Sequence, residues 1–201
     1  MTNDISKLMI KLGESARLSA EYLARTSNQQ RNKAISHIAQ SIQKNTNKIL
    51  EANSLDIKAA REKGLSESMI DRLMLDKDRI DSMASSMNII TKIEDPINKI
   101  TEEWSRPNGM IIQRVSVPLG VIGIIYESRP NVTADAAALC IKSGNPAILR
   151  GGSESFESNK AIYFCLREGL ADAGFDPLSI QLVPIKDRSA VGYMLSSMSN
   201  F

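Results

Sequence analysis

The chain has 201 residues, 42% apolar and 24% charged, which is enough for one sizeable folded domain with its own core. A formal net charge of +2 with only 4% aromatic residues excludes the basic footprint and the stacking platforms of nucleic-acid-binding proteins. No apolar run is long enough to cross a bilayer, so we expect no membrane partner.

The first part of the chain has the periodicity of helices from residue 3 to about residue 95. Apolar residues recur at helical spacing in three stripes, at 5–23, 34–42 and 80–90. Between the stripes, we predict Asn53 and Ser66 as helix N-caps and Gly64 as a helix stop. Residues 1–107 are therefore predicted as a helical amino-terminal part.

Short apolar strands follow, after Pro96 and residues 104–109 break the helical pattern. Residues 108–118 are predicted as a strand or hairpin segment, because MIIQRVSV alternates before a proline. Residues 120–127, GVIGIIYE, form a near-continuous apolar run, typical of a strand buried in a parallel sheet. The remaining elements alternate: a helix at 134–142, a strand at 146–150, a helix at 153–173, a strand at 179–185, and a last helix capped by Asp187 or Ser189. This order predicts an α/β fold with a parallel, right-handed wound βαβα core in residues 119–201.

The strongest candidate site is the strand-to-helix corner Arg150-Gly151-Gly152-Ser153, followed by Glu154. Exposed N–H groups and the helix dipole at such a corner favour an anion such as a phosphate. A guanidinium at the strand end can hold phosphate oxygens bidentately. The alternative is a glycine-rich connection with a surface arginine, since the string is neither G-x-G-x-x-G nor a P-loop.

A second candidate site follows the first buried strand, in YESRPNVT at residues 126–133. Arg129, Asn131 and Thr133 are donors at the carboxyl edge of the sheet, where they can bind a carboxylate or acyl phosphate or support a developing oxyanion. The alternative is that Asn131 or Thr133 simply caps the next helix, with Pro130 shaping the turn.

Cysteine and histidine are scarce in this chain. Cys140 and Cys165 are the only cysteines, which argues against a disulfide scaffold and fits a reducing cytoplasm. Both lie among apolar residues with no base or cation beside them in the sequence, so we expect packing and not nucleophilic chemistry. His37 is the only histidine, so no metal site and no Ser-His-Asp triad is predicted.

Two blocks of sequence carry a family resemblance: VPLGVIGIIYESRPNVT and LCIKSGNPAILRGGSES. They closely resemble the gamma-glutamyl phosphate reductases, also called glutamate-5-semialdehyde dehydrogenases, of the aldehyde dehydrogenase superfamily. The earlier segments ILEANSLDIKAAREKGLSESMIDRLML and IIQRVSVPLG fit the same family. The similarity covers essentially the whole chain and corresponds to the amino-terminal half of the family.

The resemblance implies an aldehyde-dehydrogenase-like fold, with the helical region packed on an incomplete parallel Rossmann-like sheet of a cofactor domain. It implies NADPH-dependent reduction of L-glutamate 5-phosphate to L-glutamate 5-semialdehyde and phosphate, in proline biosynthesis. Arg150 occupies the place of a cofactor-contacting lysine in relatives and would suit the extra phosphate of NADP. Gly151, Gly152 and Ser153 would then approach the adenosine ribose and phosphate, and either Arg129 or Asn131 would face the oxyanion.

The same resemblance implies that parts of the family's enzyme lie outside this sequence. The family's nucleophilic cysteine belongs to a catalytic domain downstream of Phe201, so we expect a truncated chain that is inactive alone. A separate carboxyl-terminal half or a second copy of the chain would be its partner. Two alternatives remain: a non-catalytic NADP-binding fragment that pairs with such a half, and a helical interaction module in residues 1–95 on an inert support.

Overall fold

The fold was analysed in a computed structural model, which describes residues 2–196. The chain begins with five helices: α1 (Thr2–Leu23), α2 (Asn28–Lys44), α3 (Thr46–Glu62), α4 (Glu67–Leu73) and α5 (Lys77–Lys92). Local signals set several of their ends. Ser27 and Gln30 form a capping box at the start of α2, and the Asp76 carboxylate accepts from the Arg79 N–H at the start of α5. Gly64, predicted as a helix stop, follows α3 with a φ of +71°.

The two predicted caps have different outcomes. Ser66 does lie at the N-cap position of α4, although its side chain makes no capping hydrogen bond. The prediction for Asn53 was wrong, because this residue lies inside α3 and is buried. Its side-chain amide instead donates to the Leu73 carbonyl and accepts from the Leu75 N–H, at 2.8 Å each. Asn53 therefore fixes the loop between α4 and α5.

The α/β prediction is confirmed by a parallel three-stranded sheet in the order β3-β4-β5. Its strands are β3 (Ile122–Ile125), β4 (Ala147–Arg150) and β5 (Ile180–Leu182), and its crossover helices are α6 (Asn131–Lys142) and α7 (Phe156–Asp172), the latter preceded by a short 3₁₀ turn, η1 (Ser153–Ser155). All four residues of the central strand β4 are buried, as predicted. The predicted burial of the apolar run at 120–127 was wrong, because β3 lies at the edge of the described sheet and its residues Gly123 and Ile125 are exposed.

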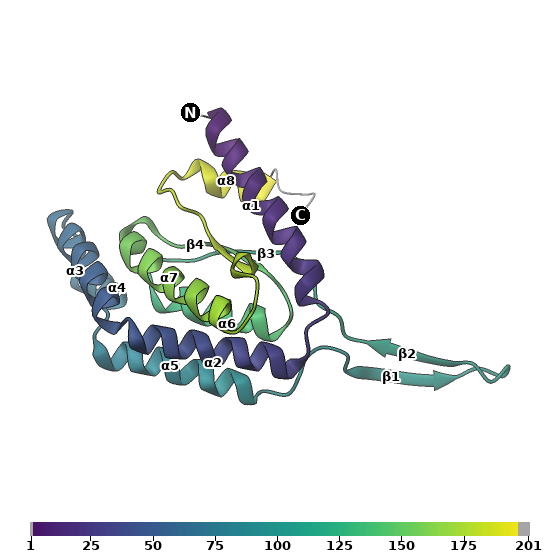
Figure 1. The fold of residues 1–201 in the computed structure, drawn as a ribbon. Coiled ribbons are helices and arrows are strands. Elements are labelled where there is room, and N and C mark those ends of the chain that lie inside the picture. Colours follow the sequence, from purple (N-terminus) through teal and green to yellow (C-terminus); the bar gives the residue numbers. More distant parts are fainter. Residues whose placement is uncertain (1, 197–201) are drawn as a thin grey trace.

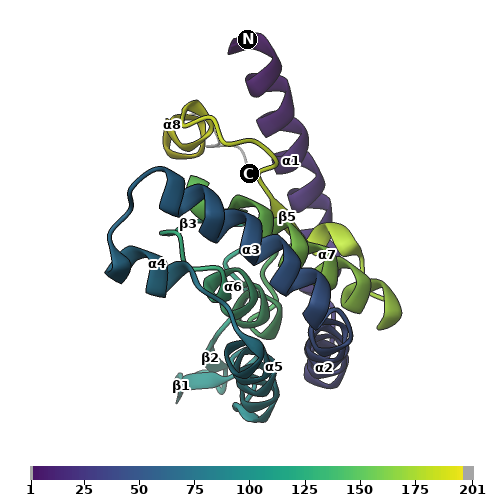
Figure 2. The ribbon, with the colours of Figure 1, turned by 90° about the vertical axis from the view of Figure 1, so that its left-hand side faces the viewer.

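Helices cover the sheet in layers (Figures 1 and 2). Helices α6 and α7 lie against one face, α2 and α5 pack on them, and α1 and α8 (Ser189–Ser196) lie on the other side. One core of buried apolar residues runs from Leu23 through the helices to Leu182 on β5. Helix α2 approaches α7 so closely that a Cβ atom on Gly169 would collide with the Ile38 backbone. The amino-terminal helices thus share their core with the sheet.

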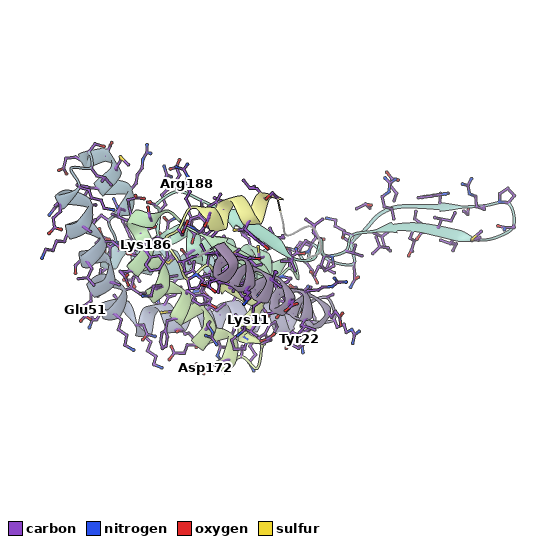
Figure 3. All side chains as sticks on the ribbon, turned by 90° about the horizontal axis from the view of Figure 1, so that it is seen from above. Lys11, Tyr22, Glu51, Asp172, Lys186 and Arg188 are labelled. Carbon is purple, nitrogen blue, oxygen red and sulfur yellow. The ribbon has the colours of Figure 1, made fainter. Side chains whose placement is uncertain are left out.

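A two-stranded hairpin extends away from this body (Figures 1 and 3). It consists of β1 (Ile100–Ser105) and β2 (Ile111–Val115), paired antiparallel. The first of these strands falls within the part predicted to be helical, so that prediction was wrong for residues 100–105. Every residue of β1 is exposed, as are four of the five in β2. With neither face of the hairpin buried, no strong apolar alternation marks β1 in the sequence.

Candidate functional site

The two predicted sites lie next to each other at one edge of the sheet. Strands β3 and β4 pair in parallel up to Ile125 and Arg150, so both leave the sheet at its carboxyl edge. The Tyr126 N–H donates to the Arg150 carbonyl at 3.1 Å, which joins the bend after β3 to the corner after β4. Open α/β sheets bind ligands outside this edge. The topology therefore places the chain's polar bends where a ligand is expected.

The glycines of the corner are explained by close packing against the bend. A Cβ atom on Gly152 would collide with the Ser128 hydroxyl and lie 2.8 Å from the Ser128 nitrogen. A Cβ atom on Gly151 would collide with the Asn159 amide and lie 2.9 Å from the Tyr126 ring. Any side chain at either position would push the corner away from the bend. These glycines set the spacing between the two candidate sites.

Glu154 completes the contact between the corner and the bend. Its carboxylate accepts hydrogen bonds from the Ser128 hydroxyl at 2.7 Å and from the Ser153 hydroxyl at 2.8 Å. The Ser128 hydrogen bond is the largest reason why the pKa of Glu154 lies below its ordinary value. The Glu154 side of the corner thus carries a negative charge, which suits hydroxyl groups as hydrogen-bond donors.

Arg150 is a buried residue and not the surface arginine of the alternative interpretation, since only 7% of it is exposed. Its guanidinium donates to the carbonyl oxygens of Gly151 and Lys186, the latter at 3.1 Å, while its Nε has no partner. Within residues 2–196, no carboxylate forms an ion pair with it. A buried cation without a counter-charge is costly, because its hydration is lost and only neutral dipoles replace it.

The sequence predicted exposed N–H groups at the start of this helix that would favour a phosphate, but two N–H groups in the first turn of α7 donate to a carboxylate of the chain itself. The buried carboxylate of Asp56, on α3, accepts from the Glu157 N–H at 3.2 Å and from the Ser158 N–H at 2.7 Å. It also accepts from the Ser158 hydroxyl at 2.7 Å. These donors are therefore not available to a phosphate. A ligand at the corner must use the residues before α7, which are Arg150 to Glu154.

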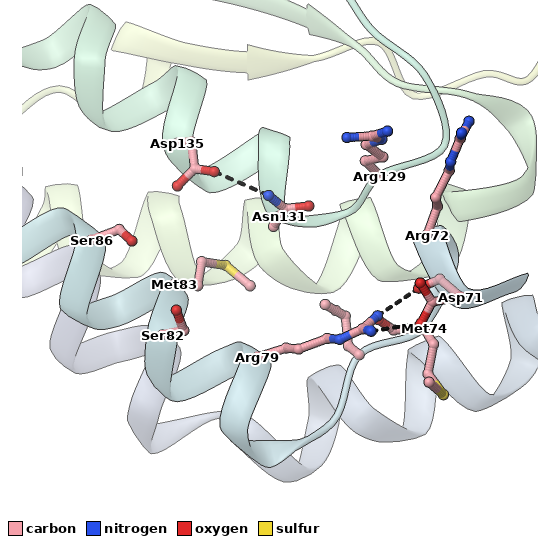
Figure 4. A pocket seen from close by; sticks show the side chains of 11 residues that line it. Asp71, Arg72, Met74, Arg79, Ser82, Met83, Ser86, Arg129, Asn131 and Asp135 are labelled. Carbon is pink, nitrogen blue, oxygen red and sulfur yellow. Dashed lines mark hydrogen bonds and ion pairs between the residues drawn. The ribbon is translucent and has the colours of Figure 1, made fainter. Parts of the chain in front are cut away.

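Two pockets flank the bend. The first, which we call the α4–α6 pocket, has a volume of about 460 Å³ (Figure 4) and is lined by Asp71, Arg72, Met74, Leu75, Arg79, Ser82, Met83, Ser86, Arg129, Asn131 and Asp135. The second, which we call the corner pocket, has a volume of about 400 Å³ and is lined by Met69, Arg72, Glu127, Ser128, Arg129, Gly152 and Glu154. Arg72 and Arg129 line both pockets, so the two form neighbouring parts of one surface.

The structure brings Arg129 and Asn131 into the α4–α6 pocket but leaves Thr133 out. Thr133 is fully buried and shares hydrogen bonds with the Tyr126 hydroxyl and the Asn159 side chain, so it is not a donor for a ligand. The capping interpretation was also wrong, because α6 starts after Pro130 without a side-chain cap. The Asn131 amide instead donates to the Asp135 carboxylate at 3.2 Å. Asp135 was missed, although its position four residues after Asn131 puts it on the same helix face.

Cys140, Cys165 and His37 line neither of the two pockets. Cys140 and Cys165 are buried, and loss of hydration raises the pKa of each thiol to about 11. Such thiols are almost entirely protonated at neutral pH and are poor nucleophiles. His37 is half-buried on α2. Among the residues that the structure describes, no group of His, Cys, Asp and Glu side chains has the arrangement of a metal site, and no helix is long and apolar enough to span a membrane.

Comparison with known proteins gives a consistent family. A gamma-glutamyl phosphate reductase of Paramagnetospirillum magneticum is 52% identical over 200 residues, which are 100% of this chain and 47% of that protein. The crystal structure of gamma-glutamyl phosphate reductase from Thermotoga maritima matches with a TM-score of 0.91 and 40% identity, over 93% of this chain and 45% of that one. The chain is a relative of the gamma-glutamyl phosphate reductases. It spans about half the length of the curated relatives it matches.

The fold of this reductase relative is also that of aldehyde dehydrogenases. A propionaldehyde dehydrogenase from Clostridium phytofermentans matches with a TM-score of 0.62 over 94% of this chain and 40% of that one. Its sequence identity of 17% supports the fold alone. No protein-family model matches the chain. The predicted family resemblance and the predicted aldehyde-dehydrogenase-like fold are both confirmed.

Proposed function

We propose that this chain forms the cofactor-binding part of an NADPH-dependent reductase that converts L-glutamate 5-phosphate to L-glutamate 5-semialdehyde and phosphate, in proline biosynthesis. The observation that carries the proposal is the match to gamma-glutamyl phosphate reductases, in sequence and in fold, along nearly the whole chain. The free thiols Cys140 and Cys165 fit an enzyme of the reducing cytoplasm.

NADPH is assigned to the corner because of the charge of Arg150. This buried guanidinium has no carboxylate partner within residues 2–196, so a phosphate brought next to it would supply the missing counter-charge. NADPH carries one phosphate more than NADH, on the adenosine ribose. Gly151, Gly152 and Ser153 form the adjoining turn, in which Gly152 and Ser153 are partly exposed and can be reached by a ligand.

The bend after β3 is assigned to the substrate side of the reaction. Arg129 lines both pockets and carries a cation that suits an anionic substrate, and the Asn131 amide lies in the α4–α6 pocket beside Asp135. The cofactor supplies the hydride for the reduction. The chain's own residues bind and orient the reactants. Neither of its thiols is activated, so we propose that the chain alone does not turn over substrate.

A comparison of the two nicotinamide cofactors tests the assignment of Arg150. The fluorescence of NADPH and of NADH is titrated with the purified chain, with Arg150→Ala and with Arg150→Lys. We expect Arg150→Ala to weaken NADPH binding about tenfold more than NADH binding, and Arg150→Lys to retain most of the preference. The ratio of the two affinities within one variant cancels any partial unfolding. Equal losses for both cofactors would contradict the assignment.

A non-catalytic NADP-binding unit that acts with a partner polypeptide is the second candidate. It is favoured by apolar side chains around β3 that solvent reaches, since Val117 is 72% exposed, Leu119 88% and Ile125 44%. Multi-angle light scattering and thermal melting of the chain test this candidate. A monodisperse monomer with one cooperative transition would count against a need for a partner. An independent helical interaction module is not favoured, because residues 23–90 share their core with the sheet.

A further inference from the structure

The α4–α6 pocket carries charges of both signs that the cofactor proposal does not use. Its two carboxylates differ in their partners. Asp71 is neutralised by Arg79, whose guanidinium lies 2.7 Å from the Asp71 carboxylate and also donates to the main-chain carbonyls of Asp71 and Met74. Figure 4 shows this pair at the end of the pocket remote from Asp135. The Asp71–Arg79 ion pair therefore forms part of the pocket wall, and its charges are already compensated.

Asp135 is the carboxylate without a counter-charge. It is half-buried on α6, and it accepts a hydrogen bond from the neutral Asn131 amide at 3.2 Å. No lysine or arginine among residues 2–196 forms an ion pair with it. Burial raises the pKa of this carboxyl group, against a smaller lowering by the Asn131 hydrogen bond. A cationic group entering the pocket would relieve that cost.

Arg72 and Arg129 supply the positive charge of the pocket, and each makes only a long contact with a carboxylate. Their nearest carboxylate is that of Glu127, 3.9 Å from Arg72 and 3.7 Å from Arg129. All three side chains are about half or more exposed, so these contacts are weak and easily exchanged for a better ligand. The α4–α6 pocket thus offers one unpaired carboxylate and a guanidinium from the neighbouring bend. Such a pair of charges matches a zwitterion.

We propose that the α4–α6 pocket binds the α-amino-acid end of the substrate, with Asp135 accepting from the α-ammonium group and Arg129 donating to the α-carboxylate. Asn131 is then a positioning residue that holds the Asp135 carboxylate. This inference rests on the proposed function, because that function supplies an amino acid as the substrate. Since Arg129 also lines the corner pocket, the opposite end of the substrate extends past the bend toward the cofactor side.

The test compares two stable dicarboxylates that differ only in the ammonium group. L-Glutamate and glutarate are titrated into the ¹⁵N-labelled chain, and shifts of the amide signals are followed by NMR. The variant is Asp135→Asn, which keeps the shape and removes the charge. The control is Asp172→Asn, which makes the same charge change at an exposed position near the end of α7, outside both pockets (Figure 3).

We expect L-glutamate to bind the chain and the Asp172→Asn control about tenfold more tightly than glutarate does, with shifts at residues 82–86 and 129–135. In Asp135→Asn the preference should fall to about twofold or less. Equal binding of both ligands, a preference that persists in Asp135→Asn, or no binding of L-glutamate up to about 50 mM would overturn the inference.

A parallel titration with NADPH separates this inference from the function on which it rests. NADPH binding without any preference for L-glutamate would reject the amino-acid pocket and leave the cofactor assignment in place. A preference for L-glutamate without NADPH binding would support the pocket and remove the cofactor part of the proposed function.

Discussion

Replacing Asp56 by alanine tests how the corner is held in place. The Asp56 carboxylate is 4% exposed and accepts three hydrogen bonds from the first turn of α7, two of them from main-chain N–H groups. It reaches this turn from α3, 101 and 102 residues earlier in the sequence. Removing it leaves the N–H groups of Glu157 and Ser158 without a partner. The helix that follows the corner should then fray at its start.

The expected loss combines two opposing effects. Each buried N–H group left unsatisfied costs about 1–3 kcal/mol, and loss of an N-cap costs about 1 kcal/mol. Against this, burial raises the pKa of Asp56 in spite of its hydrogen bonds, so the carboxylate carries a hydration cost that the alanine variant lacks. We therefore expect the free energy of unfolding to fall by about 2 kcal/mol at pH 7. Urea unfolding followed by circular dichroism measures it.

The pH dependence of this loss has a definite sign. Because the pKa of Asp56 is raised on folding, protonation favours the folded state, and the added stability disappears as the pH rises through the folded pKa. The difference between the original chain and Asp56→Ala should thus grow as the pH falls toward the ordinary pKa of 3.8. Glu51→Ala, an exposed change on the same helix, is the control. A loss below about 0.5 kcal/mol, equal to that of the control, would refute the capping argument.

Two further changes probe the packing and the charge of the same region. Gly169→Ala should cost about 3 kcal/mol in urea unfolding, because a Cβ atom there collides with the Ile38 backbone, whereas Gly192→Ala, with nothing within 4 Å, should be neutral or slightly stabilising. Similar effects of the two alanines would contradict the close approach of α2 and α7. Ser128→Ala should cost about 1 kcal/mol at pH 7. The Ser128 hydrogen bond stabilises the charged form of Glu154, and the pKa of Glu154 in the folded chain lies below its ordinary value of 4.5. The loss of stability should therefore vanish as the pH falls through this folded pKa. A loss that persists at lower pH would exclude Glu154 as the cause.

The amino-acid sequence alone predicted the α/β core and the carboxyl edge of the sheet at which both candidate sites lie. The apolar runs at 120–127, 146–150 and 179–185 predicted three parallel strands, and each contains one of β3, β4 and β5. The predicted burial holds for β4 and β5 but not for β3, in which two of four residues are exposed. The runs that contain β4 and β5 can be recognised because a strand buried on both faces needs apolar side chains at nearly every position. Parallel strands end at the same edge, so the sequence also brought the bend with Arg129 close to the corner with Arg150.

Strand β1 of the hairpin and the role of Asn53 could not be predicted from apolar patterns. Strand β1 contains exposed, mixed residues, ITEEWS, because its pairing partner is β2 and no core lies against either face. The N-cap prediction for Asn53 failed because the residue type alone does not show what the side chain contacts. Its polar side chain suits an N-cap, but it equally suits a buried position when main-chain groups of a neighbouring loop, at Leu73 and Leu75, face it.

Only the tertiary structure showed the burial and the partners of the polar side chains near the carboxyl edge of the sheet. Arg150 is buried without a counter-charge, and the first turn of α7 donates to Asp56. Asp135 accepts from Asn131 but forms no ion pair among residues 2–196, and it lines a pocket built from α4, α5 and α6. Periodicity reports how one element meets its surroundings. It carries no information on which charged side chain of a distant helix contacts a given polar group. That contact determines whether the donor or carboxylate remains available to a ligand.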